Sequence, residues 1–318
     1  MFRYKTIRTL IRNKTMKFKL ILFCILVGLL LAACSPKTQP VMTVTDDLGR
    51  ELSLPRSPLK IISLAPSNTE ILFAIGAGEL VVGRDEVSDY PADVLALPAV
   101  GGFAGYNLEQ IASLQPDLIL AAEINSPELV KSIESLGLDI YYMANPTDFD
   151  ELFENINTIG RLVNREKQAE ELVSALQVRL QRVLKTLEGA ETTPKVFYEL
   201  DASDPSKPWS VGPGTYHTTI IEMAKAENIA AKAETNYPQI SLEEIIYQNP
   251  DYILLADALW GVTPEQVAAR PGWEAIKAVQ QGNVLPFDAN LLDRAGPRLV
   301  EGLETIARLL HPELTWAE

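Results

Sequence analysis

The stretch LEQIASLQPDLILAAE, residues 108–123, recurs as LEEIIYQNPDYILLAD, residues 242–257, with eight of the sixteen positions identical. Each copy begins with a short segment that has polar residues near its start, continues with Pro-Asp and ends in an apolar run. This is the pattern of a helix that leads into a buried strand. Glu109 and Glu243 occupy the same place in the two copies. A helix–strand unit that occurs twice predicts two similar α/β lobes.

The rest of the chain alternates between the same two kinds of element. Short apolar runs predict strands, and segments with apolar residues at helical spacing predict helices. Ser67, with Glu70 three residues later, forms a candidate capping box for the first helix. Strands that alternate with helices indicate parallel sheets. A hairpin is expected over 42–54, strands over 60–64, 80–83, 117–122, 139–143, 195–200 and 284–287, and helices over 69–75, 127–136, 215–224 and 298–310.

Two helices are expected between the halves, with Thr147 and Asn164 as their capping residues. The second repeats Leu or Val at helical spacing up to Gly189 and would be about 36 Å long, enough to join two lobes. A ligand most naturally lies in the cleft between such lobes. The expected organisation is a signal peptide (1–33), a tether with the hairpin (34–58), an N-terminal lobe (59–146), connecting helices (147–190) and a C-terminal lobe (191–318).

The N-terminal segment has the features of a secretory signal. It carries seven Lys or Arg and no acid before residue 34, and residues 20–33 (LILFCILVGLLLAA) are apolar throughout. Such a run is short for a bilayer span and suits a signal peptide. It ends in Leu-Ala-Ala-Cys, which resembles a bacterial lipobox with Cys34 as the lipidated residue, although an ordinary signal peptide with a chance cysteine is the alternative. Translation can start at Met1 or at Met16.

Composition excludes several function classes. Without the signal segment, 21 basic residues face 42 acidic ones, a net charge near −21 that argues against a nucleic acid partner. Cys34 would be the only cysteine of the mature chain, so no disulfide framework or thiolate metal site is expected. His217 and His311 are the only histidines, and no hydrolase or metalloprotease motif occurs. An enzyme, a receptor for bare metal ions and a structural surface lipoprotein with an empty cleft are the rival interpretations.

The paired glutamates indicate a docking function. Asn107 and Ser241 are good capping residues, which places Glu109 and Glu243 in the first turn of each helix. Acids in a first turn commonly stabilise the helix dipole, by ~0.3–1 kcal/mol. Their repetition on both lobes suggests instead a pair that meets a two-fold symmetric basic partner.

Candidate ligand contacts lie in the loops. The stretch Gly101–Tyr106 offers glycines for close backbone approach and Phe103 as a flat apolar surface. The turn Gly212-Pro213-Gly214 precedes a helix and could bind an anion, but a structural turn is the better interpretation. Arg294 and Arg298 could meet an anionic group or balance local acids.

Four stretches resemble one family over essentially the whole mature chain. They are KIISLAPSNTEILFAIGAGELVVGRDEVSDYP (60–91), VGGFAGYNLEQIASLQPDLILAA (100–122), YPQISLEEIIYQNPDYILL (237–255) and LLDRAGPRLV (291–300). They resemble the cobalamin and siderophore class (class III) of periplasmic substrate-binding proteins of ABC importers, and most closely its members that bind vitamin B12. This resemblance implies two Rossmann-like lobes joined by one long backbone helix, the helical-backbone metal receptor type.

The resemblance also implies roles for individual residues. Glu109 and Glu243 match the glutamates that pair with arginines of the two permease subunits. Phe103 and Tyr237 stand where cobalamin-binding members have cleft tryptophans, whereas Val87 replaces a tyrosine of the family. Arg294 matches a cleft-side arginine and is favoured over Arg298. Further cleft candidates, placed by their loops, are Tyr106, Trp209, Tyr216, Trp260 and Asn290.

These observations predict a lipid-anchored substrate-binding protein, not an enzyme, that faces the periplasm or cell exterior. It would bind a corrinoid in the cleft and deliver it to an ABC importer permease dimer with its ATPase. A ferric siderophore or haem is the alternative ligand. No resident cofactor or metal is expected, since the metal chelate is the cargo, and the chain is expected to act as a monomer.

Overall fold

The computed structural model describes residues 42–316. The predicted signal peptide and lipidated Cys34 lie outside these residues. Both predicted lobes lie within one compact unit, Thr43–Glu318. Among the described residues, no helix is long and apolar enough to cross a membrane.

The N-terminal lobe is built on a four-stranded parallel sheet in the order β4-β3-β7-β8. Its core lies between the sheet and the surrounding helices and includes Ile62, Ile111 and Ile119. The hairpin predicted over 42–54 is confirmed. The elements of this lobe are β1 (Met42–Thr45), β2 (Glu51–Leu54), β3 (Ile61–Ser63), α2 (Pro66–Ala74), β4 (Val81–Arg84), β5 (Gly101–Gly102), β6 (Gly105–Tyr106), α3 (Leu108–Ser113), β7 (Leu118–Ala122), α4 (Pro127–Ser135), β8 (Ile140–Met143) and α5 (Phe149–Leu162).

The C-terminal lobe repeats this plan. Its parallel sheet has the order β10-β9-β11-β12, so in both sheets the chain order of the strands is second, first, third, fourth. A separate core around Phe197, Ile253 and Trp273 fills this lobe. The elements are β9 (Lys195–Glu199), α7 (Tyr216–Met223), β10 (Glu227–Asn228), α8 (Leu242–Gln248), β11 (Tyr252–Leu255), α9 (Pro264–Ala268), α10 (Lys277–Gln281), β12 (Val284–Pro286) and α11 (Leu299–Leu310). The sequence repeat, α3–β7 and α8–β11, supplies the third strand of each sheet.

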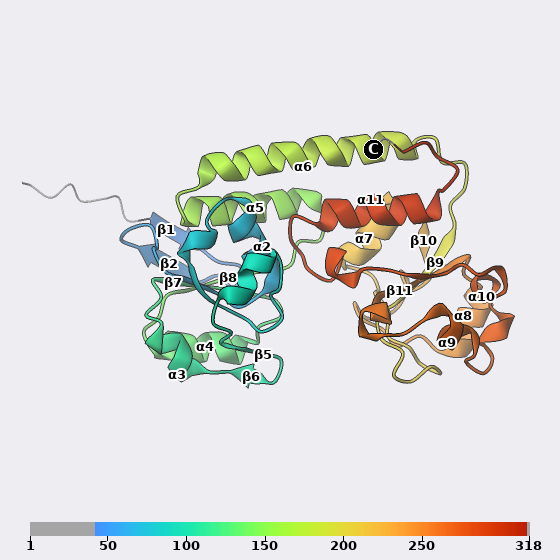
Figure 1. Ribbon diagram of the computed structural model, residues 1–318, viewed down its shortest axis with the longest axis horizontal. Helices are drawn as coiled ribbons and strands as arrows, with labels where there is room; N and C mark the ends of the chain where they lie inside the picture. The colour runs from blue at the N-terminus through green and yellow to red at the C-terminus, as the bar shows by residue number, and fades with distance from the viewer. Residues whose placement is uncertain (1–41, 317–318) are drawn as a thin grey trace, which may run out of the picture. The chain divides into compact units, whose positions relative to one another are not determined.

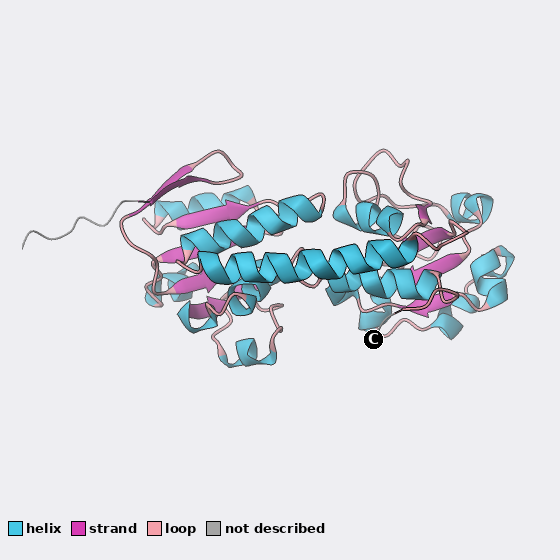
Figure 2. Ribbon diagram, turned by 90° about the horizontal axis from the view of Figure 1, so that it is seen from above, coloured by secondary structure: helices cyan, strands magenta, loops and turns pink. Residues whose placement is uncertain are grey.

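One helix, α6 (Glu166–Leu187), packs against elements of both lobes. It contacts α5 of the first lobe and α11 of the second, and Figures 1 and 2 show it extending along both. Its buried face includes Val173, Leu180 and Val183. At 22 residues it is about 33 Å long. Arg179 of α6 also pairs with Glu304 of α11 at 2.8 Å, which confirms the predicted connection through one long helix.

Three predicted helix caps are wrong. Ser67 lies inside α2, whose capping residue is Ala65, and Glu70 instead pairs with Arg298. Asp148, not Thr147, caps α5. Asn164 adopts a left-handed φ of 55° just beyond the end of α5, so it follows α5, and α6 begins after Arg165.

Candidate functional site

A cavity of about 520 Å³ lies where the carboxyl ends of both sheets come together. In doubly wound sheets, ligands bind beyond these ends, where the strand order reverses. Here the reversals fall between β3 and β7 and between β9 and β11. The cavity is lined by Pro66, Glu86, Val87, Asp89, Phe103 and Ile124 of the first lobe and by Leu259, Trp260, Ala289, Asn290, Asp293 and Arg294 of the second. We take this interlobe cleft as the candidate ligand site.

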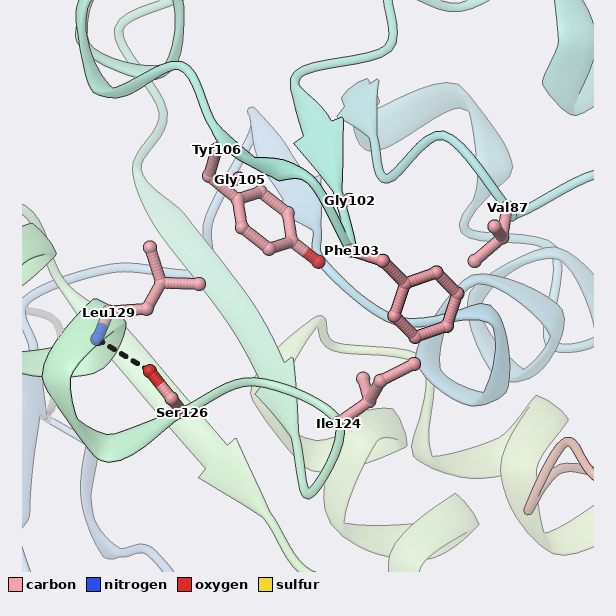
Figure 3. A pocket seen from close by; sticks show the side chains of 8 residues that line it. All are labelled: Val87, Gly102, Phe103, Gly105, Tyr106, Ile124, Ser126 and Leu129. Carbon is pink, nitrogen blue, oxygen red and sulfur yellow. Dashed lines mark hydrogen bonds between the residues drawn. The ribbon is translucent and has the colours of Figure 1, made fainter.

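The hairpin β5–β6 presents Phe103 to the cleft. Gly101 and Gly105 have φ values of 125° and 128°, and a Cβ on Gly101 would lie 2.3 Å from the Gly105 carbonyl oxygen. Only glycine therefore fits this tight turn. The turn leaves the Phe103 ring 77% exposed. In Figure 3 the ring lies between Val87 and Ile124.

Tyr106 lines a smaller hollow of about 280 Å³ behind Phe103 and does not reach the larger cavity. Its hydroxyl donates to the Leu64 carbonyl oxygen at 3.1 Å and accepts from the Asn125 amide at 2.9 Å. Burial raises the pKa of Tyr106 to about 12. The phenol is thus a neutral group held by the protein itself, and only its ring is available to this hollow.

Two short 3-10 helices form the opposite wall. The first, Ala256–Trp260, follows β11 directly and ends at Gly261, which has a left-handed φ of 92°. It leaves Trp260 82% exposed at the cleft. The second, Ala289–Leu291, places Asn290 in the lining. Phe103 and Trp260 therefore offer an aromatic surface from each lobe to the same cavity.

Arginines join the two lobes at the edge of the cleft. Arg294 pairs with Asp89 and donates to the Val87 carbonyl oxygen at 3.3 Å. Arg298 donates to both oxygens of Glu70, at 3.0 and 2.6 Å. The hydrogen bond from Arg294 lowers the pKa of Asp89, whereas burial raises the pKa of Glu70. Arg294 lines the cavity, while Arg298 lies outside its lining.

The cleft is dominated by acids. Among its lining residues, Glu86, Asp89 and Asp293 are opposed only by Arg294. The Arg294 guanidinium already pairs with Asp89 and lies 3.7 Å from Glu70. The lining therefore offers an approaching ligand more uncompensated carboxylate than guanidinium, and it should disfavour anionic ligands.

The remaining aromatic candidates lie outside the lining of the main cavity. Tyr216 is buried and stacks on His217 at 4.2 Å between ring centroids, and the half-exposed Tyr237 meets the same imidazole edge-on at 6.4 Å. Burial raises the pKa of Tyr237, and the Glu123 carboxylate of the first lobe raises it further. Tyr237 therefore lies within electrostatic reach of the N-terminal lobe. Trp209 is half-exposed and pairs through its backbone with Asp201 and Gln239.

The histidines and the glycine turn have structural partners. His217 shares a hydrogen bond of 3.1 Å with Asp293, and the buried His311 ring contacts the Ala224 carbonyl oxygen at 2.9 Å. A Cβ on Gly212 would lie 2.3 Å from the Thr235 carbonyl oxygen, so the backbone packs closely there. Among the described residues, no group of three or more His, Cys, Asp or Glu could hold a metal ion.

The two repeated helices carry the other candidate site. The side chains of Asn107 and Ser241 cap α3 and α8 by accepting hydrogen bonds from backbone N–H groups. Glu109 and Glu243 follow in the first turns and are exposed. Within residues 42–316, neither carboxylate has an ion pair or hydrogen bond. Both are thus free to pair with another molecule.

Sequence reasoning missed several lining residues, above all Ile124 and Leu259. Both follow the strand of a repeated unit, β7 or β11, by two to four residues. The signal was available, because ligands bind beyond the carboxyl ends of parallel strands. Aromatic side chains had drawn the prediction instead to loops such as that of Trp209.

Comparison with known proteins gives consistent results. An uncharacterized ABC transporter substrate-binding lipoprotein of Bacillus subtilis is 34% identical over 278 residues, covering 86% of each chain. The vitamin B12-binding protein of Vibrio cholerae is 31% identical, covering 81% of this chain and 91% of its own. The structure of a possible iron-binding, periplasmic solute-binding protein of Staphylococcus epidermidis matches with a TM-score of 0.70 and 30% identity, over 80% of this chain and all of that one.

The periplasmic binding protein family model matches residues 61–291, which span both sheets and most of the cleft lining. The chain therefore belongs to the periplasmic binding protein family, the exported, non-enzymatic solute-binding components of importers.

Proposed function

We propose that this chain is a lipid-anchored substrate-binding protein that captures a corrinoid in the interlobe cleft and delivers it to an ABC importer. The acid-dominated cleft with an aromatic surface on each side carries the proposal. A corrinoid is a large, flat metal chelate whose periphery carries neutral amides. Those amides can donate hydrogen bonds to carboxylates such as Glu86 and Asp293, while Phe103 and Trp260 contact the apolar surfaces.

Charge separates this ligand from the main alternatives. Haem carries two propionates, and many ferric siderophores are anionic. Such groups would approach three carboxylates and a single arginine that is already paired. A cleft that selects anions would need unpaired basic side chains. The similarity to the vitamin B12-binding protein of Vibrio cholerae supports the same choice.

A neutral ferric chelate is the second candidate. Its support is the structural likeness to the possible iron-binding protein of Staphylococcus epidermidis. A neutral hydroxamate complex would meet the cleft without the repulsion expected for haem. This candidate keeps the same cleft and the same docking surface.

Calorimetric titration of the soluble domain, beginning after Cys34, tests the ligand. Cyanocobalamin, haem and a neutral ferric hydroxamate are compared side by side. Saturable binding of cyanocobalamin at one site, with much weaker binding of haem, is the expected result. Binding of an iron chelate, with no binding of cyanocobalamin, would indicate a function in iron acquisition instead.

Delivery is tested through the two free glutamates. Glu109→Ala with Glu243→Ala should abolish transport and leave ligand affinity unchanged, because neither residue lines the cleft. Normal transport by the double variant would remove the docking assignment. Cys34→Ser should release the protein from the membrane fraction if Cys34 carries the lipid.

A further inference from the structure

Tyr247 stands out among the exposed side chains. Phe103, Tyr247 and Trp260 are the most exposed large hydrophobic residues of the described chain, and Tyr247 is 81% exposed. The other two line the cleft, whereas Tyr247 lies on α8, away from it. A single exposed aromatic residue is ordinary on a protein surface, so the neighbours of Tyr247 decide what its ring can contact.

Tyr247 lies one helical turn from Glu243. Residues four apart on a helix are neighbours on one face, about 5–6 Å apart at Cβ. Neither side chain has a hydrogen bond, ion pair or ring contact with another described residue. The face of α8 therefore presents a carboxylate and an aromatic ring together, both unoccupied.

Among residues 42–316, a carboxylate and an aromatic ring hold an arginine between them three times. Arg298 pairs with Glu70 and lies 4.2 Å from the Tyr90 ring centroid. Arg270 pairs with Glu199 and lies 4.5 Å from the Trp273 ring centroid. Arg308 pairs with Glu304 and lies 5.4 Å from the Trp316 ring centroid. A guanidinium can pair with a carboxylate through its edge while its flat face stacks on a ring.

The N-terminal lobe lacks the ring at the equivalent position. Ser113 occupies the place of Tyr247 in the repeat, and its hydroxyl donates back to the Gln110 carbonyl oxygen at 2.8 Å. Glu109 thus offers a carboxylate alone. The two docking helices are equivalent in position but unequal in chemistry.

We propose that Glu243 and Tyr247 form a receptor for one arginine of the permease, which pairs with the carboxylate and stacks on the ring. The proposal rests on the docking function proposed above and adds the chemistry of the C-terminal contact. The acidity of the chain supports a basic partner. The C-terminal lobe then makes the stronger of the two contacts, and Tyr247 is its aromatic anchor.

The test measures the dissociation constant between the ligand-loaded protein and its permease–ATPase complex in lipid nanodiscs. Tyr247→Ala should weaken binding about 5- to 30-fold, and Tyr247→Phe should stay within about twofold of the parent because the ring is retained. Tyr247→Ala combined with Glu243→Ala should weaken binding less than the product of the single effects, because both contact one arginine. Ser113→Tyr, which copies the C-terminal pair onto the N-terminal lobe, should strengthen binding.

Unchanged melting temperatures serve as the control for folding. An effect of Glu243→Ala without any effect of Tyr247→Ala would overturn the arginine receptor and leave the docking function standing. Effects that multiply independently would also overturn it. If neither Glu109→Ala nor Glu243→Ala weakened binding to the permease–ATPase complex, both the arginine receptor and the proposed docking surface would be overturned.

Discussion

Arg298 holds Glu70 through both carboxylate oxygens across the two lobes, although the residues are 228 positions apart in the chain. Glu70 is only 3% exposed. This pair ties α2 of the first lobe to the segment before α11 of the second, and Arg294 of the same segment pairs with Asp89 in the loop after β4. Opening of the cleft, which separates the lobes, would therefore have to separate these paired residues.

Removal of Arg298 should destabilise the protein strongly. Arg298→Met leaves a buried carboxylate with only Arg294 nearby, at 3.7 Å, and should lower the free energy of unfolding by about 3–5 kcal/mol. Glu70→Met in the same chain should restore most of this loss. Denaturant titration measures both effects. Arg56→Met is the matched control, because the exposed pair of Arg56 with Asp117 should contribute less than about 1 kcal/mol; an equal loss in the two variants would contradict the prediction.

The aromatic surfaces of the cleft should contribute to ligand affinity from both sides. Phe103→Ala and Trp260→Ala should each weaken ligand binding about 5- to 100-fold, because each removes a large exposed ring from the cavity wall. Calorimetry with cyanocobalamin, which represents the proposed ligand class, measures the effect. Val178→Ala, on the exposed face of α6, is the control and should leave affinity unchanged. An unchanged dissociation constant for Phe103→Ala would remove Phe103 from the site.

A buried acid pair should make stability depend on pH near neutrality. Glu199 ends β9 and Asp257 follows β11, and Arg270 pairs with Glu199 alone, at 2.6 and 2.8 Å. Neither carboxylate oxygen of Asp257 has a hydrogen bond of normal geometry within residues 42–316, and hydrogen bonding to the Glu199 carboxyl and to the Ala202 backbone N–H offsets only part of the effect of its burial. Burial raises the pKa of Glu199 from 4.5 to about 7 and also raises that of Asp257.

The direction of this pH dependence follows from the raised pKa of Glu199. The folded state holds the proton more tightly than the unfolded state, so the stabilisation is complete below about pH 4.5 and is lost as the pH rises through about 7. Thermal unfolding at about pH 5 and about pH 8 should show a loss on the order of 2–3 kcal/mol from this pair. Asp257→Asn should reduce the loss, because Glu199 then has no acidic neighbour. Asp139→Asn, an exposed acid, should not change it, and an identical loss in Asp257→Asn would exclude the pair as its source.

The sequence predicted the features that depend on neighbouring residues in the chain, but not those that depend on contacts between distant segments. The repeated unit predicted the second α-helix of each lobe and the third strand of each parallel sheet, and Asn107 and Ser241 cap α3 and α8 as expected. The prediction at Ser67 failed because its capping partner, Glu70, instead pairs with an arginine from the other lobe, a contact that no local pattern reveals. Asn164 was placed at the start of α6 because asparagine favours caps, but it tolerates the left-handed conformation that follows α5 equally well.

The residues of the cleft also differ in whether the local sequence could predict their positions. Phe103 was predicted from its glycine turn and Trp260 from its loop, and both line the cavity. The burial of Tyr106 and Tyr216 could not be predicted from the sequence, because a tyrosine ring suits a core as well as a ligand site. Only the packing of Tyr106 against Leu64 and Asn125 shows that its hydroxyl is already occupied.

The acidity of the cleft should control which metal chelates bind. Glu86 is an exposed lining residue, and no described side chain forms an ion pair with it. Glu86→Gln removes one negative charge without a change of shape, so the affinity for haem, with its two propionates, should rise about 3- to 10-fold at low ionic strength. The affinity for neutral cyanocobalamin should change by less than about twofold, and added salt should reduce the gain for haem. Because Glu170→Gln removes the same charge from an exposed residue of α6, outside the cleft lining and without an ion pair to any described side chain, it is the matched control. Equal effects of the two substitutions would mean that the net charge of the protein, and not the cleft, repels anionic ligands.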